Sequence, residues 1–132
     1  MARKRAHDLE HHPLDARLLT FDIQALADKI KKEESWSKGD RNAMTLMKGK
    51  GFRVVLVGMH DGAKIESHRT DNPVSLQVLE GSVKFNTDSG DVTLKTGNLV
   101  TLQAGISHGV EAIEECVFLL TLTTDRLHPA EG

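Results

Sequence analysis

The chain has 132 residues, of which 39% are hydrophobic and 27% charged, with a formal net charge of -2 at pH 7. This length and balance fit one globular domain with a single core. The charge shows no basic excess of the kind that indicates a nucleic-acid partner, and no apolar run is long enough to cross a bilayer.

The cysteine count and the first residues bear on the compartment. The single cysteine, Cys116, excludes an intrachain disulfide. It lies in an apolar run, where we expect a buried, unreactive thiol rather than a catalytic one. Residues 1–13 are charged and rich in histidine and contain no apolar segment of a signal peptide. We therefore expect a cytoplasmic protein that binds neither nucleic acid nor membrane.

The first predicted element is a helix from Asp22 to about Glu34, after a polar N-terminal tail of residues 1–20. Its apolar residues recur at helical spacing, and these are Phe21, Ile23, Leu26, Ala27 and Ile30. Thr20 or Asp22 is the predicted N-cap, and the lysines near the end suit the helix dipole. The apolar face must pack on the body of the domain or on a partner subunit. We assign residues 21–42 to this helix and a linker.

From residue 43 to residue 124 the pattern changes to short stretches rich in valine, leucine and threonine, separated by turns that contain glycine. Nine strands are predicted, at residues 44–48, 52–59, 63–69, 74–79, 82–86, 92–95, 99–103, 109–112 and 116–123. Many short strands at regular spacing indicate an all-β sandwich or barrel. The run from Cys116 to Leu120 is apolar on both faces, which predicts burial on both and suggests a dimer interface as one cause. Residues 125–132 form a C-terminal tail.

Two segments of this region resemble the two sequence motifs of the cupins. The first family motif is a glycine, His-x-His, a glutamate and a closing glycine, and its spacing is kept here by Gly62, His68, Thr70, Val74 and Gly81. The second is a glycine, a proline, another glycine, a histidine and an asparagine, and its spacing is kept by Gly97, Gln103, Gly105, His108 and Ala112. The resemblance extends over roughly residues 53–123. It implies an all-β, cupin-type jelly-roll barrel of two antiparallel sheets, here with one N-terminal helix, and a homodimer.

The resemblance also bears on metal binding. Cupins that bind metal hold it with three histidines and a glutamate. His68 matches the first histidine and His108 the third, whereas Thr70 and Val74 replace the second histidine and the glutamate. Two neutral imidazoles alone rarely hold a divalent ion. The resemblance therefore implies a degenerate metal site without a cofactor, and the alternative is a rebuilt site for a divalent transition metal.

Glu66 is the candidate for rebuilding the site. Glu66, His68 and Thr70 are spaced by two, so in a regular strand they share one face. Glu66 either completes a two-histidine, one-carboxylate metal set with His68 and His108, or it is a solvated residue at the barrel mouth. His60 likewise either leans toward the site or lies on the surface.

Three further polar residues are candidates for the interior of the barrel. Arg53 shares strand parity with Val55 and Val57, so it is either an inward-facing anion clamp or an edge residue. Gln77 and Gln103 either hydrogen-bond a ligand or face outward.

The favoured hypothesis is a protein that binds a small molecule inside the barrel without a standard metal site. Its predicted ligand-binding residues are His68, His108, Thr70, Val74, Gln77 and Arg53. The alternative is a metal-dependent enzyme, oxygenase-like or isomerase-like, with the ligand set His68, His108 and Glu66. A third hypothesis is a structural barrel that acts only through its interfaces. The fold alone does not decide among them, because function depends on the site that the fold carries.

Overall fold

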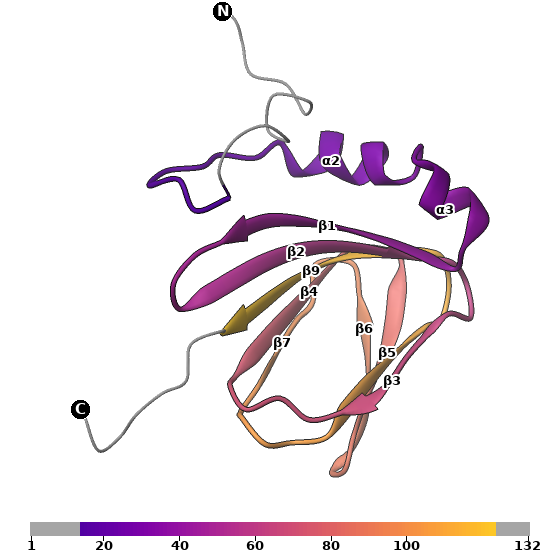
Figure 1. Ribbon diagram of the computed structural model, residues 1–132. Coiled ribbons are helices and arrows are strands. Elements are labelled where there is room, and N and C mark those ends of the chain that lie inside the picture. The colour runs from indigo at the N-terminus through magenta and orange to yellow at the C-terminus, as the bar shows by residue number, and fades with distance from the viewer. Residues whose placement is uncertain (1–13, 124–132) are drawn as a thin grey trace, which may run out of the picture.

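The computed structural model describes residues 14–123, and these form two facing antiparallel sheets with two short helices outside them (Figure 1). The strands are β1 (Arg41–Lys48), β2 (Phe52–Met59), β3 (Lys64–His68), β4 (Val74–Glu80), β5 (Ser82–Thr87), β6 (Gly90–Lys95), β7 (Leu99–Leu102), β8 (His108–Ala112) and β9 (Cys116–Thr123). Their order is β1-β2-β9-β4-β7 in one sheet and β3-β8-β5-β6 in the other. Each predicted strand overlaps an observed one, and the predicted all-β fold class is confirmed.

The core lies between the two sheets and is built by alternate residues of their strands. Val57 and Met59 of β2 point into it, together with Phe118 of β9. The facing sheet contributes Phe85 of β5 and Val110 of β8. Because side chains alternate along a strand, the intervening residues of β2 and β9 lie on the outer face of the five-stranded sheet.

Two helices take the place of the single helix predicted for residues 22–34. The helix α2 (Ile23–Ile30) begins as expected, with the Asp22 carboxylate accepting a hydrogen bond of 3.2 Å from the Ala25 N–H. It ends early, and α3 (Glu34–Lys38) follows, so part of the predicted loop at residues 37–40 is helical. Asn42 of β1 accounts for the break, because its Nδ2 donates to Ile30 O at 2.8 Å and to Glu33 Oε1 at 2.9 Å. This amide satisfies a carbonyl that the helix end leaves unpaired.

The helix α2 covers the outer face of the five-stranded sheet. Its buried residues Leu26, Ala27 and Ile30 pack against Leu56 of β2 and Val117 of β9, and Figure 1 shows the two helices lying along β1 and β2. Both faces of β9 are therefore buried within one chain. The two surfaces that the sequence offered for a partner subunit, the helix stripe and the last strand, are used internally.

The remaining sequence predictions concern the chain ends and the membrane. Residues 1–13 and 124–132, which hold most of the two predicted tails, lie outside the described residues. Between residues 14 and 123, no helix is long and apolar enough to cross a membrane.

Candidate functional site

The two motif histidines meet at one end of the barrel. His68 is the last residue of β3 and His108 the first of β8, and the two are register partners. Their ring centroids lie 4.6 Å apart, with the planes tilted by 50°. His108 is buried, with 6% of its surface exposed, whereas His68 is exposed at the rim. The structure thus brings together two residues that the sequence separates by 40 positions.

An irregularity in β3 brings His68 into this position. Ile65 pairs with Val110, and His68 pairs with His108, so β3 holds one residue more than β8 between these two pairs. Ile65 packs against the interior core. In a regular strand His68 would then lie on the opposite face, because the two positions differ by three. The extra residue is a β-bulge, which returns His68 to the side of the core.

Both histidines are oriented by their own main chain. The Nδ1 of His68 lies 3.0 Å from Glu66 O, and the Nδ1 of His108 lies 2.9 Å from Ile106 O. A carbonyl oxygen only accepts, so Nδ1 carries the proton in each ring. Within residues 14–123, neither Nε2 has a hydrogen-bond partner. The neutral pair therefore presents two unused acceptors at the same place.

Phe85 of β5 forms the floor below this pair, and the sequence analysis missed this role. Its ring stacks on that of His108, with centroids 5.6 Å apart and planes 14° from parallel. Phe85 is buried in the core. The signal was present in the strand alternation, because Val83 and Phe85 lie on the same face. What the sequence lacked was the register that places β5 beside β8.

The facing wall of this end is mostly apolar. One register row runs across the five-stranded sheet from Arg53 of β2 through Leu122 of β9 and Val74 of β4 to Leu102 of β7. These positions lie two residues beyond the core row of Val55, Leu120, Leu76 and Val100, so they lie on the same, inner face. We define the barrel mouth as this row together with His68 and His108.

Arg53 is the charged member of the mouth. Its Nε is buried and has no hydrogen-bond partner. No ion pair joins Arg53 to an acidic residue in the described part of the chain. A buried donor left without a partner costs about 1–3 kcal/mol. This residue therefore lies on the inner face, the first of the two alternatives that the sequence left open for its placement.

Thr70 and Val74 fill the two replaced ligand positions with structural roles. Thr70 Oγ1 donates to Asn72 O at 2.9 Å, and Thr70 O accepts from the Gly105 N–H at 2.9 Å. These bonds close the β3–β4 loop and tie it to the loop before β8. Val74 is 6% exposed and offers only methyl groups to the mouth. The residues present therefore do not fit the three-histidine, one-glutamate metal set.

Glu66 does not complete a reduced metal set either, which corrects the rebuilt-site alternative. Glu66 is exposed, and its main-chain oxygen rather than its carboxylate contacts His68. In the part of the chain that the structure describes, no three His, Cys, Asp or Glu side chains are grouped so that they could hold a metal ion. The bulge explains the discrepancy, because it breaks the spacing of two that placed Glu66 and His68 on one face.

His60 lies away from the mouth. It follows the far end of β2, its ring stacks on Trp36 with centroids 3.7 Å apart, and its Nε2 lies 2.8 Å from Trp36 O. Its role is to join α3 to the end of β2. The interpretation in which His60 leans toward the histidine pair is therefore corrected.

The two glutamines also lie outside the mouth. Gln77 occupies the outer face of β4, between the inward-facing Leu76 and Val78, and its Nε2 donates to Gly97 O at 3.4 Å. Gln103 is exposed in the loop after β7. The structure corrects the placement of both residues as lining the barrel interior.

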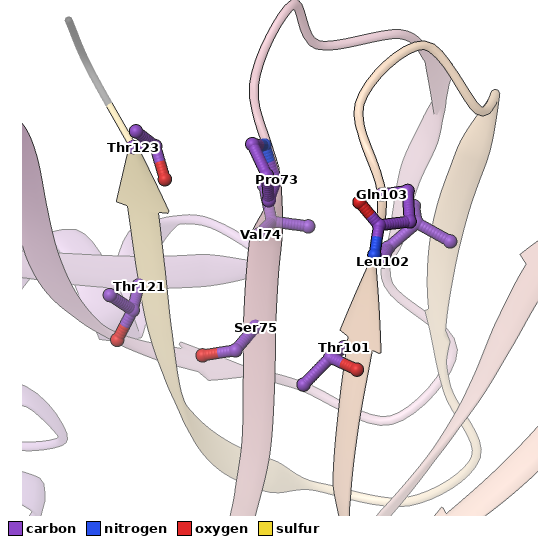
Figure 2. A pocket seen from close by; sticks show the side chains of 8 residues that line it. All are labelled: Pro73, Val74, Ser75, Thr101, Leu102, Gln103, Thr121 and Thr123. Carbon is purple, nitrogen blue, oxygen red and sulfur yellow. The ribbon is translucent and has the colours of Figure 1, made fainter. Parts of the chain in front are cut away.

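Gln103 instead lines a groove of ≈ 240 Å³ that runs along the ends of β9, β4 and β7 (Figure 2). Its hydroxyl groups come from Ser75, Thr101, Thr121 and Thr123. Ser75 pairs with both Thr121 and Thr101, one position away from the inward-facing row. The groove therefore lies on the outer face of the five-stranded sheet and is separate from the mouth.

Comparisons with known proteins identify the fold. No family model and no curated protein matches the chain. A cupin superfamily protein from Desulfitobacterium hafniense matches with a TM-score of 0.67 and 17% identity, over 76% of this chain and 88% of its own. A conserved protein of unknown function from Streptococcus pyogenes matches with a TM-score of 0.66 and 19% identity, over 85% and 90%.

A third solved structure shows the range of functions that this fold carries. It is described as a sugar phosphate isomerase from a cupin superfamily of Silicibacter pomeroyi, and it matches with a TM-score of 0.57 and 22% identity, over 65% of this chain and 60% of its own. At these identities the likeness concerns the fold. The chain thus has the cupin fold, as its sequence motifs predicted, and its specific activity has to be argued from the mouth.

Proposed function

We propose that this cupin-fold chain binds a small molecule at the barrel mouth through His68 and His108, without the four-ligand metal set. One observation carries the proposal. The two imidazoles lie 4.6 Å apart, and each Nδ1 is engaged by a main-chain carbonyl, so both Nε2 atoms are left for a ligand. Rings held in this way are already oriented, which lowers the entropic cost of binding.

The surroundings of the pair support a ligand with polar and apolar parts. In their neutral form the two Nε2 atoms accept hydrogen bonds, and in their charged form they donate them. Val74, Leu102 and Leu122 offer an apolar wall on the facing sheet. Small-molecule sites commonly combine such a wall with a few converging polar groups. The ring of Phe85 against His108 adds a flat apolar floor.

Thermal-shift screening of a metabolite collection tests the proposal on three proteins: the wild type, His68→Ala and Glu66→Gln. His68 is exposed, so its truncation leaves the core intact. We expect compounds that raise the melting temperature of the wild type and of Glu66→Gln but not that of His68→Ala. The proposal fails if every stabilising compound acts equally on all three proteins.

Elemental analysis of the same proteins tests the metalloenzyme alternative. If the wild type carried about one metal ion per chain, and if both His68→Ala and Glu66→Gln lost it, a rebuilt metal site would replace our proposal. Metal content that is unchanged in Glu66→Gln rules out Glu66 as a ligand. The positions of Glu66 and Val74 favour the metal-free interpretation.

A homodimer and a cytoplasmic location stay predictions from the sequence. The single cysteine supports a reducing compartment. The dimer has lost its two sequence-based arguments, because α2 and β9 pack within the chain. Sedimentation analysis of the full chain decides between monomer and dimer.

A further inference from the structure

The barrel mouth holds a guanidinium group that has no counter-ion. Arg53 is the second residue of β2 and faces the same side as Val55 and Val57, which pack in the interior. Its Nε is buried without a partner, and no carboxylate within residues 14–123 forms an ion pair with it. Buried charges are normally paired, so this arginine is completed by a group that does not belong to the described chain.

The strand neighbours of Arg53 do not supply that group. Its register partners are Lys48 on β1 and Leu122 on β9. Beyond Leu122, the same row continues with Val74 and Leu102. The neighbouring charge is therefore a second cation, and the local field favours an anion.

The opposite sheet also contributes no acid at this level. Figure 1 shows β2 and β3 in the two facing layers. In the second sheet, the row at this end of the barrel is His68, His108 and Thr87. Thr87 Oγ1 donates to Gly90 O at 2.6 Å and so closes its own hairpin. What remains across from Arg53 is the pair of histidines with two unused Nε2 atoms.

The shape of these groups narrows the ligand chemistry. A guanidinium matches a planar carboxylate, which accepts two parallel hydrogen bonds from it. The leucine and valine side chains of the row, and the ring of Phe85 under His108, suit an apolar body. A bare inorganic ion would leave that apolar surface unused.

We infer that Arg53 is the anion-binding residue of the barrel mouth and that the ligand is a small organic carboxylate with an apolar body. The carboxylate lies against the guanidinium, and the other end of the molecule lies at His68 and His108. This inference rests on the proposed function, which it deepens by naming the ligand class.

The test uses benzoate and benzamide as probes, because the two have nearly the same shape and only benzoate is charged. Each is titrated into the full ¹⁵N-labelled chain and followed by amide chemical shifts. We expect benzoate to shift the amides of Arg53, Val74 and Leu122 and to bind about tenfold or more tightly than benzamide, as expected for a hydrogen bond to a charged group.

Three variants separate the role of Arg53 from general charge. Arg53→Met should weaken benzoate binding about tenfold and bring it to the level of benzamide. Arg53→Gln, which keeps a polar side chain, should do the same and serves if the methionine variant does not fold. Lys48→Met removes the neighbouring, exposed cation and should keep most of the preference for benzoate.

Two results would overturn the inference. One is equal affinity of the wild type for the two probes, and this includes the case in which neither shifts the mouth amides. The other is unchanged benzoate affinity in both Arg53 variants. If His68→Ala then abolishes binding of either probe while the Arg53 variants do not, the inference fails and the proposed function stands. If no variant of either group has an effect on any ligand of the chain, both fail.

Discussion

His68 and His108 meet because β3 holds one residue more than β8 between two matched pairs. The bulge needs room on the partner strand, and Gly109 provides it. A Cβ atom at Gly109 would lie 2.9 Å from Ile65 O and 3.2 Å from Ser67 N, which are main-chain atoms of the bulge. The geometry of the histidine pair therefore depends on a glycine next to His108.

The first prediction concerns this glycine. Gly109→Ala should lower the free energy of unfolding by about 1–3 kcal/mol, because the added methyl group meets main-chain atoms that cannot move aside. It should also displace His68 from His108. Urea unfolding measures the first effect, and nuclear Overhauser contacts between the two rings measure the second.

Gly49→Ala is the matched control for Gly109→Ala. At Gly49 the new Cβ would meet only the end of the Met47 side chain, at 2.7 Å from Cε. That flexible side chain can turn away, so we expect a change below about 0.5 kcal/mol. Equal losses in the two variants would mean that the bulge does not depend on Gly109.

The second prediction concerns Gly81, in the turn between β4 and β5. Its φ is +78°, and a Cβ there would lie 2.2 Å from Glu115 O. Gly81→Ala should therefore combine backbone strain with a clash and destabilise the fold by more than about 2 kcal/mol. Thermal and urea unfolding measure the loss.

Gly62→Ala separates the two causes at Gly81. Gly62 has a φ of +85°, but nothing lies within 4 Å of a Cβ at that position. Its substitution should cost only the strain of a left-handed backbone, about 1–2 kcal/mol. If the two variants lose the same stability, the close approach of Glu115 O has no energetic weight.

The fold could be predicted from the sequence because its signals are local. The stretch from Phe52 to Met59 is apolar and bounded by glycine on one side and by the Asp61-Gly62 turn on the other, and it forms the predicted strand. Glycine turns at conserved-type spacings likewise placed the two motif histidines. What the sequence did not show depends on contacts between distant segments.

Two such contacts account for the main errors. The bulge in β3 depends on its pairing with β8, so the spacing of Glu66 and His68 predicted a shared face that the structure does not have. The end of α2 at Ile30 depends on the side chain of Asn42 on β1. Neither register nor a side chain from a later strand is visible in the local pattern.

The third prediction concerns the contact between α2 and the β4–β5 turn. Lys31 Nζ lies 2.6 Å from Glu80 Oε1 and 3.3 Å from Glu115 Oε2. Its hydrogen bond with Lys31 lowers the pKa of the Glu80 carboxyl below the ordinary value of 4.5, against an opposing effect of burial. Glu80→Gln should cost about 0.5 kcal/mol at pH 7, because the pair is partly exposed.

The pH dependence of this contact follows from the direction of the shift. A lowered pKa in the folded state contributes stability above pH 4.5 that is lost as the pH falls through the folded value. The difference between wild type and Glu80→Gln should therefore shrink below pH 4, as measured by urea unfolding. Glu34→Gln, which breaks the exposed pair with Lys38, is the control and should cost less. A difference that grows in acid would contradict the assignment.

The fourth prediction concerns the thiol of Cys116, at the start of β9. Burial raises the pKa of this thiol to about 11 from the ordinary 9.0, and the residue has no exposed surface. The thiolate is the reactive form. Iodoacetamide at pH 8 should therefore label the native chain far more slowly than the chain in urea, as measured by mass spectrometry.

The raised pKa also predicts a loss of stability in alkali. The folded state holds the proton more tightly than the unfolded state, so the contribution of the thiol is complete below pH 9 and is lost as the pH rises toward 11. The sequence contains no tyrosine, so the other groups that titrate in this range are chiefly lysines. Lysines are shared by wild type and Cys116→Ala, and the difference between the two isolates the thiol. That difference in unfolding free energy should favour the wild type at pH 8, because the alanine leaves a cavity, and should narrow by pH 10.5. A constant difference across this range, or rapid labelling of the native chain, would show that Cys116 is accessible to water and that the closed end of the core opens.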